Sequence, residues 1–324
     1  VNYFKSRNIG QPIQEEVVFH DHKKGTPTMG GVFIILGTYA GYVLSHINFW
    51  TIGQGFKIEL ISINPVILNL LLFGTLMASV GLIDDLLKVR KNRNLGLRAR
   101  NKIFLQILVG SFVSLYFYNL DYSSTFYFFS GFGFEVGFLK WILIVFLIVG
   151  ITNSTNLTDG LDGLAIMPSV MIAAALGVLG YASGNIIISD YLNIPYLPLS
   201  GEMLVFCGAI VGSGIGFLWF NTYPAQVFMG DVGSLSLGAA LGAIAVMIRQ
   251  EIVFAIMAGV FVAETLSVMI QVTSYKLTGK RVFKMAPLHH HFELSGWAEP
   301  KIIVRFWIIT LILILIGFAT LRLR

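Results

Sequence analysis

Charged side chains are scarce in this chain of 324 residues, because only 12% are Asp, Glu, Lys or Arg while 56% are hydrophobic. A water-soluble domain carries about 25% charged residues, and the mean hydropathy here is +0.78. This scarcity excludes an ordinary soluble enzyme. Cysteine is almost absent as well, since Cys207 is the only one, which excludes an intrachain disulfide bond. Its apolar surroundings predict a small buried side chain.

Apolar runs long enough to cross a bilayer recur along the whole sequence. We expect nine membrane-spanning helices, at 30–49, 65–83, 103–120, 137–152, 163–183, 201–220, 234–248, 251–273 and 302–321. Two of these runs, 137–152 and 234–248, are short for a span, which favours tilt or re-entrant backbone buried in protein. The predicted fold is an all-α, polytopic helical membrane protein, with residues 1–324 forming a single integral-membrane domain.

Basic residues are concentrated on one side of the predicted membrane. Of the 22 Lys and Arg residues, 16 fall in loops that the alternation of spans places on one face. Those loops are 1–29, 84–102, 153–162, 221–233 and 274–301. Cytoplasmic loops carry an excess of Lys and Arg, so we expect this face to be cytoplasmic.

The same face carries a set of acids and a histidine run that composition does not explain. They come from four loops that are far apart in the sequence: Asp84, Asp85, Asp159, Asp162, Asp231 and His289 to His291. Any one Asp at the end of a span is explained equally well by helix capping or by a turn. Five carboxylates and three imidazoles on one face instead suggest a single assembled site.

Three properties of these loops indicate the chemistry of that site. Adjacent acids such as Asp84 and Asp85 repel each other unless a cation or a proton relieves them. Hard oxygen ligands without a thiolate favour magnesium or manganese over zinc. The basic segment 84–102 suits an anionic substrate or lipid headgroups, although part of it is a topology signal. We therefore expect a metal-dependent site that handles phosphate at the membrane surface.

Three further features allow two interpretations each. The turn "GTPTMGG" at residues 25–31 could offer backbone N–H groups to phosphate, or it could simply begin a helix. Phe228 in "FMGD" could stack on a base or sugar, or pack in the core. Glu264, in the middle of a span, should face the bundle interior, either as a hydrogen-bond partner or as part of a cavity.

Taken in order, these motifs closely resemble the phospho-N-acetylmuramoyl-pentapeptide-transferase family. The resemblance runs through "GTPTMGG", "GLIDDLLK", "NSTNLTDGLDGL", "FNTYPAQVFMGDVGSL" and "PLHHHFELSGWAE", and covers nearly the whole chain. The Asp pair and "NLTDGLDG" are shared with the wider polyprenyl-phosphate N-acetylhexosamine-1-phosphate transferase superfamily. The "GTPTMGG" and "PLHHHFE" motifs select the muramoyl-pentapeptide branch.

The resemblance implies an activity, a cofactor and a location. UDP-N-acetylmuramoyl-pentapeptide and undecaprenyl phosphate would give lipid I and UMP, with Mg²⁺ required, in peptidoglycan synthesis. The sister reaction, which transfers N-acetylglucosamine 1-phosphate from its UDP derivative, is the alternative. Family members are ten-span homodimers of the bacterial inner membrane with a cytoplasm-facing site and no nucleic-acid partner. The start of this chain resembles the segment that follows the family's first span.

The resemblance also assigns roles to residues of the matching motifs. Asp231 would coordinate magnesium, and Asp84 or Asp85 would deprotonate the lipid phosphate or, alternatively, form a covalent aspartyl-phosphate. Lys88 and Lys102 would support phosphate groups. The nucleotide side would comprise Lys23, Thr28, Asn153, Asn156, Asp159, Gly160, Asp162, Asn221 and Phe228.

We expect the three adjacent histidines to have different roles. Neighbouring residues of a helix point about 100° apart, so one or two of the three imidazoles should face the site while the remainder pack or cap. The resemblance implies that His290, as a catalytic residue, and His291 lie near the phosphate and sugar side of the substrate, where an imidazole can donate to phosphate. A secondary transporter, the rival class, would place its acids near the bilayer midplane, where only Glu264 lies.

Overall fold

The computed structural model describes residues 25–48, 59–60, 64–91, 96–119, 125–127 and 133–321. The long helices are α2 (Gly31–Ser45), α3 (Pro65–Lys91), α4 (Ala99–Asn119), α5 (Leu139–Thr158), α6 (Ile166–Gly184), α8 (Met203–Asn221), α9 (Gly230–Met247), α11 (Gly259–Thr278) and α13 (Glu299–Thr320). Shorter helices are α7 (Ile186–Leu192), η2 (Ser200–Glu202), α10 (Glu251–Met257) and α12 (Leu288–Glu293). Two small antiparallel hairpins pair β1 (Ile47–Asn48) with β2 (Glu59–Leu60) and β3 (Thr125–Tyr127) with β4 (Gly133–Glu135).

The expected all-α membrane fold is confirmed. Seven of the described helices are long and apolar enough to cross a membrane, and α10 with α11 makes an eighth if the bent pair is one span. The first expected span is helical only as far as Ser45. At a rise of 1.5 Å per residue its 15 residues reach about 22 Å, short of the roughly 30 Å hydrocarbon core.

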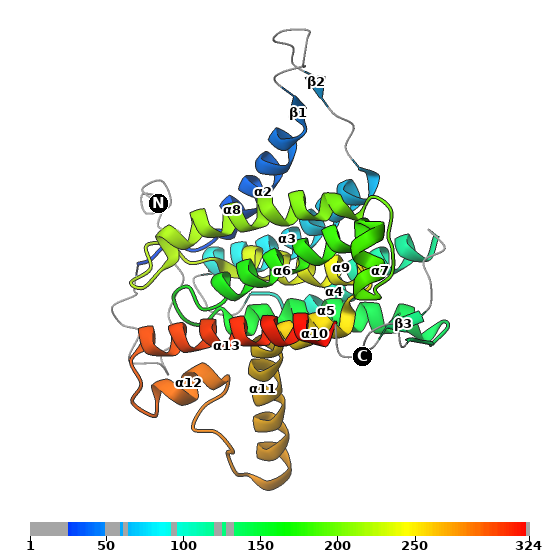
Figure 1. Cartoon of the computed structure of the whole chain (residues 1–324). Coiled ribbons are helices and arrows are strands. Elements are labelled where there is room, and N and C mark those ends of the chain that lie inside the picture. Colours follow the sequence, from blue (N-terminus) through cyan, green and yellow to red (C-terminus); the bar gives the residue numbers. More distant parts are fainter. Residues whose placement is uncertain are drawn as a thin grey trace.

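Helix α9 forms the centre of the bundle, packed against α2, α3, α5 and α6 (Figure 1). Its most apolar stretch is 89% buried, the largest share among the candidate spans. The sequence explains this position, since GDVGSLSLGAALGAIAVM is built mostly from Gly, Ala and Ser. Small residues let helix backbones approach closely in a membrane protein. The run that looked short for a span is therefore a helix that the bundle encloses almost completely.

Glycine contacts show how close that approach is. A Cβ placed on Gly31 of α2 would lie 2.2 Å from the Cα of Gly233 in α9, which no real side chain tolerates. A Cβ on Gly238 would lie 2.8 Å from the backbone of Ile151 and Thr152 in α5. Helix α9 therefore depends on glycine at its contacts with both neighbours.

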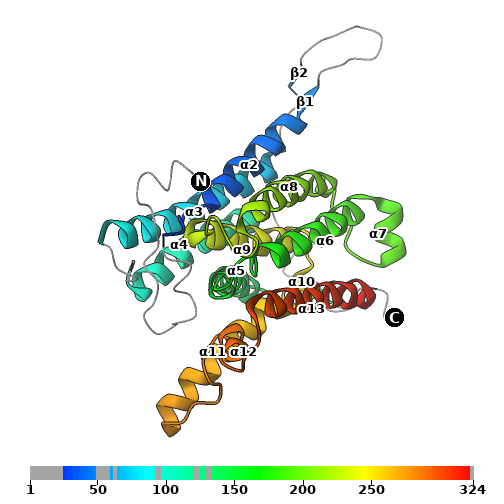
Figure 2. The same ribbon diagram turned by 90° about the vertical axis from the view of Figure 1, so that its left-hand side faces the viewer.

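The predicted span 251–273 is broken. Helices α10 and α11 meet at a 75° bend at Ala258, and α11 leaves the bundle with α12 beside it (Figures 1 and 2). Apolar side chains of α11 are exposed, including Leu266, Met269 and Leu277. Such a surface is what a lipid-facing helix requires. The bend carries the chain toward α12, where the histidine run lies.

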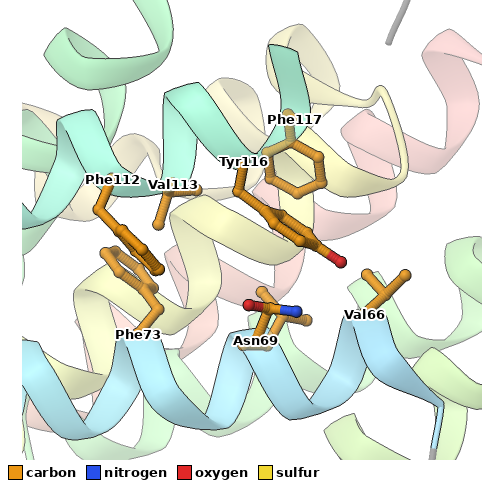
Figure 3. Close-up of a pocket in the computed structure, with 8 residues that line it drawn as sticks. Val66, Asn69, Phe73, Phe112, Val113, Tyr116 and Phe117 are labelled. Atoms are coloured by element: carbon orange, nitrogen blue, oxygen red, sulfur yellow. The ribbon is translucent and has the colours of Figure 1, made fainter. Parts of the chain in front are cut away.

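Between α3 and α4 the bundle has an apolar groove on its outer side (Figure 3). Phe73 of α3 faces Phe112 of α4 at one end of it, and Asn69 lies below Tyr116 toward the other end. The amide of Asn69 is already engaged, because it donates to Pro65 O at 2.8 Å. The groove is therefore an aromatic-lined depression between two spanning helices.

Candidate active site

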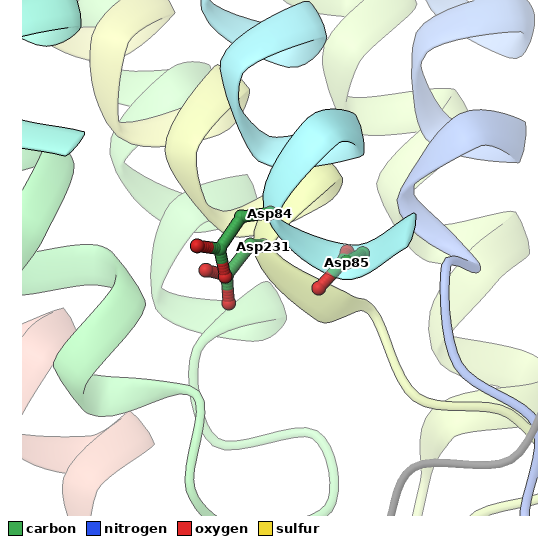
Figure 4. Close-up of side chains that lie close together, drawn as sticks. All are labelled: Asp84, Asp85 and Asp231. Carbon is green, nitrogen blue, oxygen red and sulfur yellow. The ribbon is translucent and has the colours of Figure 1, made fainter. Parts of the chain in front are cut away.

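Three carboxylates meet where the end of α3 faces the start of α9 (Figure 4). Helix α3 runs beyond the predicted end of its span to Lys91, so Asp84 and Asp85 lie inside the helix rather than in a loop. Asp231 lies in the first turn of α9. All three residues are buried, and one oxygen from each lies within 4.8 Å of the others. The expected convergence of these acids is present in the structure.

Glycines make room for each member of this triad. A Cβ on Gly81, one turn before the Asp pair, would lie 2.3 Å from the carbonyl oxygen of Asp231. A Cβ on Gly96 would lie 2.6 Å from the carboxylate of Asp84, and one on Gly230 would lie 2.6 Å from Asp85 Oδ2. Gly230 also has φ +72°, a conformation that glycine adopts without strain.

Two lysines offset the negative charge of the triad. Lys88, one turn after Asp84 on α3, places its Nζ 2.7 Å from Asp84 Oδ2, 3.5 Å from Asp85 Oδ1 and 3.0 Å from Asp231 Oδ1. Lys102 of α4 places its Nζ 2.5 Å from Asp231 Oδ2. Carboxylates this deeply buried would be costly without such partners. Both lysines that the resemblance selected therefore lie at the acids.

Backbone N–H groups fix the orientation of the Asp pair. Leu97 N–H donates to Asp84 Oδ1 at 2.7 Å, so the segment before α4 closes over that carboxylate. Val232 N–H donates to Asp85 Oδ2 at 3.1 Å, at the N-terminus of α9. Backbone donors thus hold each acid of the pair, and each acid has one oxygen within 3.5 Å of Lys88 Nζ.

The donor set fits a magnesium ion. Mg²⁺ binds oxygen ligands and takes one or two protein carboxylates together with substrate phosphate. The triad offers three carboxylates within 4.8 Å, without a thiolate or imidazole in the cluster. Asp84, Asp85 and Asp231 could therefore hold a divalent metal.

Asn156 lies against the triad, while Asn153 does not. The amide of Asn156 donates to Asp231 Oδ1 at 3.0 Å and to Ser234 Oγ at 2.8 Å. One turn earlier on α5, Asn153 exchanges hydrogen bonds with Gln106 of α4. Asn156 therefore orients the proposed metal ligand, and Asn153 joins two helices. Both lie in α5, which continues to Thr158 through the segment predicted as a loop.

The turn after α5 is tied to the loop before α9. Asn221 Oδ1 accepts from Gly163 N–H at 3.1 Å, and its Nδ2 donates to Val227 O at 2.8 Å. Asp162 Oδ2 accepts from Ala225 N–H at 2.9 Å. These two side chains, expected on the nucleotide side, hold backbone groups together and so shape the loops around the site.

Asp159 caps the C-terminus of α5 beside this turn, and its burial and the charges around it alter its pKa. Burial, together with the negative charges of Asp231 and Asp85, raises the pKa of Asp159 well above its ordinary value. A carboxyl group that holds its proton more readily can donate as well as accept a hydrogen bond. Gly160, the next residue, is exposed.

Replacing Asn221 with alanine tests whether its side chain holds the turn after α5 to the loop before α9. We expect a loss of stability of about 1–3 kcal/mol for each buried group that loses its partner. The measurement is the thermal unfolding midpoint in detergent. Asn69→Ala is the matched control, since Asn69 makes one hydrogen bond at the exposed surface of α3. An unchanged midpoint with a raised KM for the nucleotide substrate would show instead that Asn221 contacts substrate.

The "GTPTMGG" turn lies directly against the segment that leads into Asp231. Phe228 N–H donates to Pro27 O at 2.8 Å, and Gly30 N–H donates to Phe228 O at 2.9 Å. The hydroxyl of Thr28 is buried, and no hydrogen-bond partner for it lies among the described residues. Phe228 is half-buried. Thr28 and Phe228 are therefore neighbours at the site, whereas Lys23 lies outside the described residues.

The three histidines point to three different partners. His289 is 1% exposed and binds Glu264 of α11 twice, through its backbone N–H and through Nδ1, both at 3.2 Å. His290 Nδ1 donates to Glu293 at 2.7 Å, and His291 Nδ1 accepts from Lys284 N–H at 3.1 Å. The buried Glu264 is thus a hydrogen-bond partner that fastens α12 to α11.

His289 lies against the turn at Asp159. A Cβ on Gly160 would lie 2.3 Å from His289 Nε2, and this nitrogen is buried with no hydrogen-bond partner among the described residues. Sequence reasoning favoured His290 and His291 and passed over His289. The signal that could have singled it out was Glu264, since an acid in the middle of a span needs a partner.

Comparisons with known families agree with this arrangement. The family described as glycosyl transferase family 4 matches residues 67–249, more than half of the chain, from α3 to the end of α9. Phospho-N-acetylmuramoyl-pentapeptide-transferase signature 1 matches residues 23–35, which include the turn that pairs with the segment before Asp231. The chain therefore belongs to glycosyl transferase family 4, as a glycosyl-1-phosphate transferase of the phospho-N-acetylmuramoyl-pentapeptide-transferase type.

Proposed function

We propose that the chain transfers phospho-N-acetylmuramoyl-pentapeptide from its UDP derivative to undecaprenyl phosphate, giving lipid I and UMP for peptidoglycan synthesis. The observation that carries this proposal is signature 1 at residues 23–35, joined by backbone hydrogen bonds to the segment that leads into Asp231. A motif that distinguishes the muramoyl-pentapeptide branch thus lies beside the acids common to the superfamily.

The reaction that suits this site is a direct displacement. An oxygen of the lipid phosphate attacks the β-phosphorus of the nucleotide sugar, the bond to the α-phosphate oxygen breaks, and UMP leaves. Asp84 or Asp85 accepts a proton from the lipid phosphate, with each carboxylate oriented by its backbone donor. Magnesium held by Asp231 would polarise the diphosphate and offset the charge of the leaving group.

Residues around the triad hold the substrates in position. Lys102 and Lys88 neutralise phosphate oxygens. Both ammonium groups lie at Asp231, where the diphosphate would bind. Thr28, Asp159, Gly160 and Phe228 form the nucleotide side, where the buried hydroxyl of Thr28 can take a polar partner from the nucleotide. Positioning and charge neutralisation are the main ways a protein lowers the barrier to phosphoryl transfer.

The proposed setting is the bacterial inner membrane. The excess of basic residues in the predicted loops on the side of the triad supports a site facing the cytoplasm, where the nucleotide substrate dissolves. The lipid substrate is then available from the same leaflet. We expect the protein to act as a homodimer, as the family resemblance implies.

The test is release of UMP by the full chain in detergent with undecaprenyl phosphate, with and without Mg²⁺. Each assay receives either UDP-N-acetylmuramoyl-pentapeptide or UDP-N-acetylglucosamine. We expect UMP and a lipid-linked product only with the muramoyl-pentapeptide donor and only with a divalent ion. Turnover of the N-acetylglucosamine donor alone would establish the sister reaction instead. UMP release at full rate in the presence of a chelator would refute the metal assignment.

A further inference from the structure

Lys88 lies at the point that the three acids share. Its Nζ is between 2.7 and 3.5 Å from an oxygen of Asp84, Asp85 and Asp231. We propose that Lys88 is a counter-cation which a divalent ion displaces from the triad, and that its released ammonium group then binds substrate phosphate. This inference rests on the metal dependence in the proposed function. It adds that the metal binds first and that Lys88 then moves to the substrate phosphate.

The positions of the two cations are mutually exclusive. Magnesium binds carboxylate oxygen at about 2.0–2.1 Å, and the oxygens available to it include those that Lys88 contacts. An ion bound there would lie within a few ångströms of the ammonium group, in a buried setting where like charges repel strongly. One of the two cations must therefore leave.

Lys88 is able to leave without disturbing its helix. Its side chain is 14% exposed and extends from the last turn of α3, so its four-carbon stem can swing outward while the backbone stays in place. The acids cannot move in the same way. Asp84 and Asp85 are held by Leu97 and Val232 N–H, and Asp231 is held by Asn156.

Lys102 provides the contrast. It contacts one oxygen of one acid, Asp231 Oδ2, and its Nζ also lies 3.4 Å from Asn156 Oδ1. An ion that binds the opposite oxygens of the triad leaves this pair intact. Lys102 can therefore remain as a fixed positive charge, whereas Lys88 exchanges its partner from carboxylate to phosphate.

The experiment measures Mn²⁺ binding to the full chain in lipid nanodiscs by electron paramagnetic resonance, with no substrate present. Lys88→Met removes the competing charge at nearly equal length, so we expect Mn²⁺ to bind at least about tenfold more tightly than to the wild type. Lys88→Arg keeps a cation at the triad and should bind Mn²⁺ no more tightly than the wild type. Lys102→Met should change the affinity less than Lys88→Met does.

The second half of the proposal is tested with inorganic pyrophosphate as the probe. With Mn²⁺ bound, Lys88→Met should bind pyrophosphate more weakly than the wild type, because the released ammonium group is missing. Without metal the difference between the two proteins should be smaller, because Lys88 is then held by the three acids.

Each outcome has a distinct meaning. Equal or weaker Mn²⁺ binding by Lys88→Met overturns the displacement and leaves the proposed function standing. Equal pyrophosphate binding by the two metal-loaded proteins overturns the transfer of Lys88 to phosphate. Absence of Mn²⁺ binding in every variant, Lys88→Arg included, overturns the metal assignment itself, together with this inference.

Discussion

Replacing Asp231 with asparagine should reduce UMP release by about 10³-fold or more, since a metal ion supplies several kcal/mol of transition-state stabilisation and each 1.4 kcal/mol is a factor of ten. Asparagine keeps the shape of the side chain but lacks the negative charge. Asp231 is the acid that contacts both lysines and Asn156, so its charge organises the site. The measurement is the rate of UMP release at saturating Mg²⁺.

The protein itself should remain folded in the Asp231→Asn variant. Asp231 lies in the first turn of α9, and the remaining turns of that helix are held by buried contacts that the change does not touch. The matched control is Asp190→Asn, the same chemical change on an exposed residue of α7. Full activity in Asp231→Asn would refute its role as metal ligand, and loss of activity in both variants would indicate a general defect.

Much of the fold could be predicted from the sequence because hydrophobic length determines where a chain can cross a membrane. Every predicted span contains a helix in the structure, and the convergence of Asp84, Asp85 and Asp231 followed from their placement on one predicted face. The helix boundaries were less predictable. Asn156 stands in the last turns of α5 because its segment "TNSTNLT" remains helical beyond the apolar run.

The division of roles among side chains was not predictable, because it depends on distances between elements. Asn156 and Asn153 are one turn apart on α5, yet one contacts Asp231 and the other contacts Gln106. His289 became the buried member of its run only because α12 docks against Glu264 on the bent helix α11. The 75° bend between α10 and α11 makes this docking possible, and no proline in the sequence indicates where it occurs.

Glycines lie at the closest helix contacts of the bundle, and Gly81 is the one at the contact between α3 and the segment that carries Asp231. Gly81→Ala should lower turnover by about 10²-fold, since a misplacement of about 1 Å within a catalytic constellation has an effect of that size. The new Cβ would lie 2.3 Å from Asp231 O and 2.6 Å from Val232 N. Helix α3 must then move away from α9, which separates the Asp pair from Asp231.

The Gly81→Ala variant should remain folded, so that a loss of turnover reports misplaced carboxylates and not unfolding. Overpacking costs about 1–3 kcal/mol, while alanine in place of a helical glycine returns up to about 1 kcal/mol, so the helical content should be retained. Mn²⁺ binding should weaken in parallel with turnover, because both require the three carboxylates together. Gly212→Ala on α8 is the matched control, since a Cβ there meets open space. Wild-type turnover and Mn²⁺ affinity in Gly81→Ala would mean that α3 and α9 can separate without opening the triad, and the close contact at Gly81 would then serve packing alone.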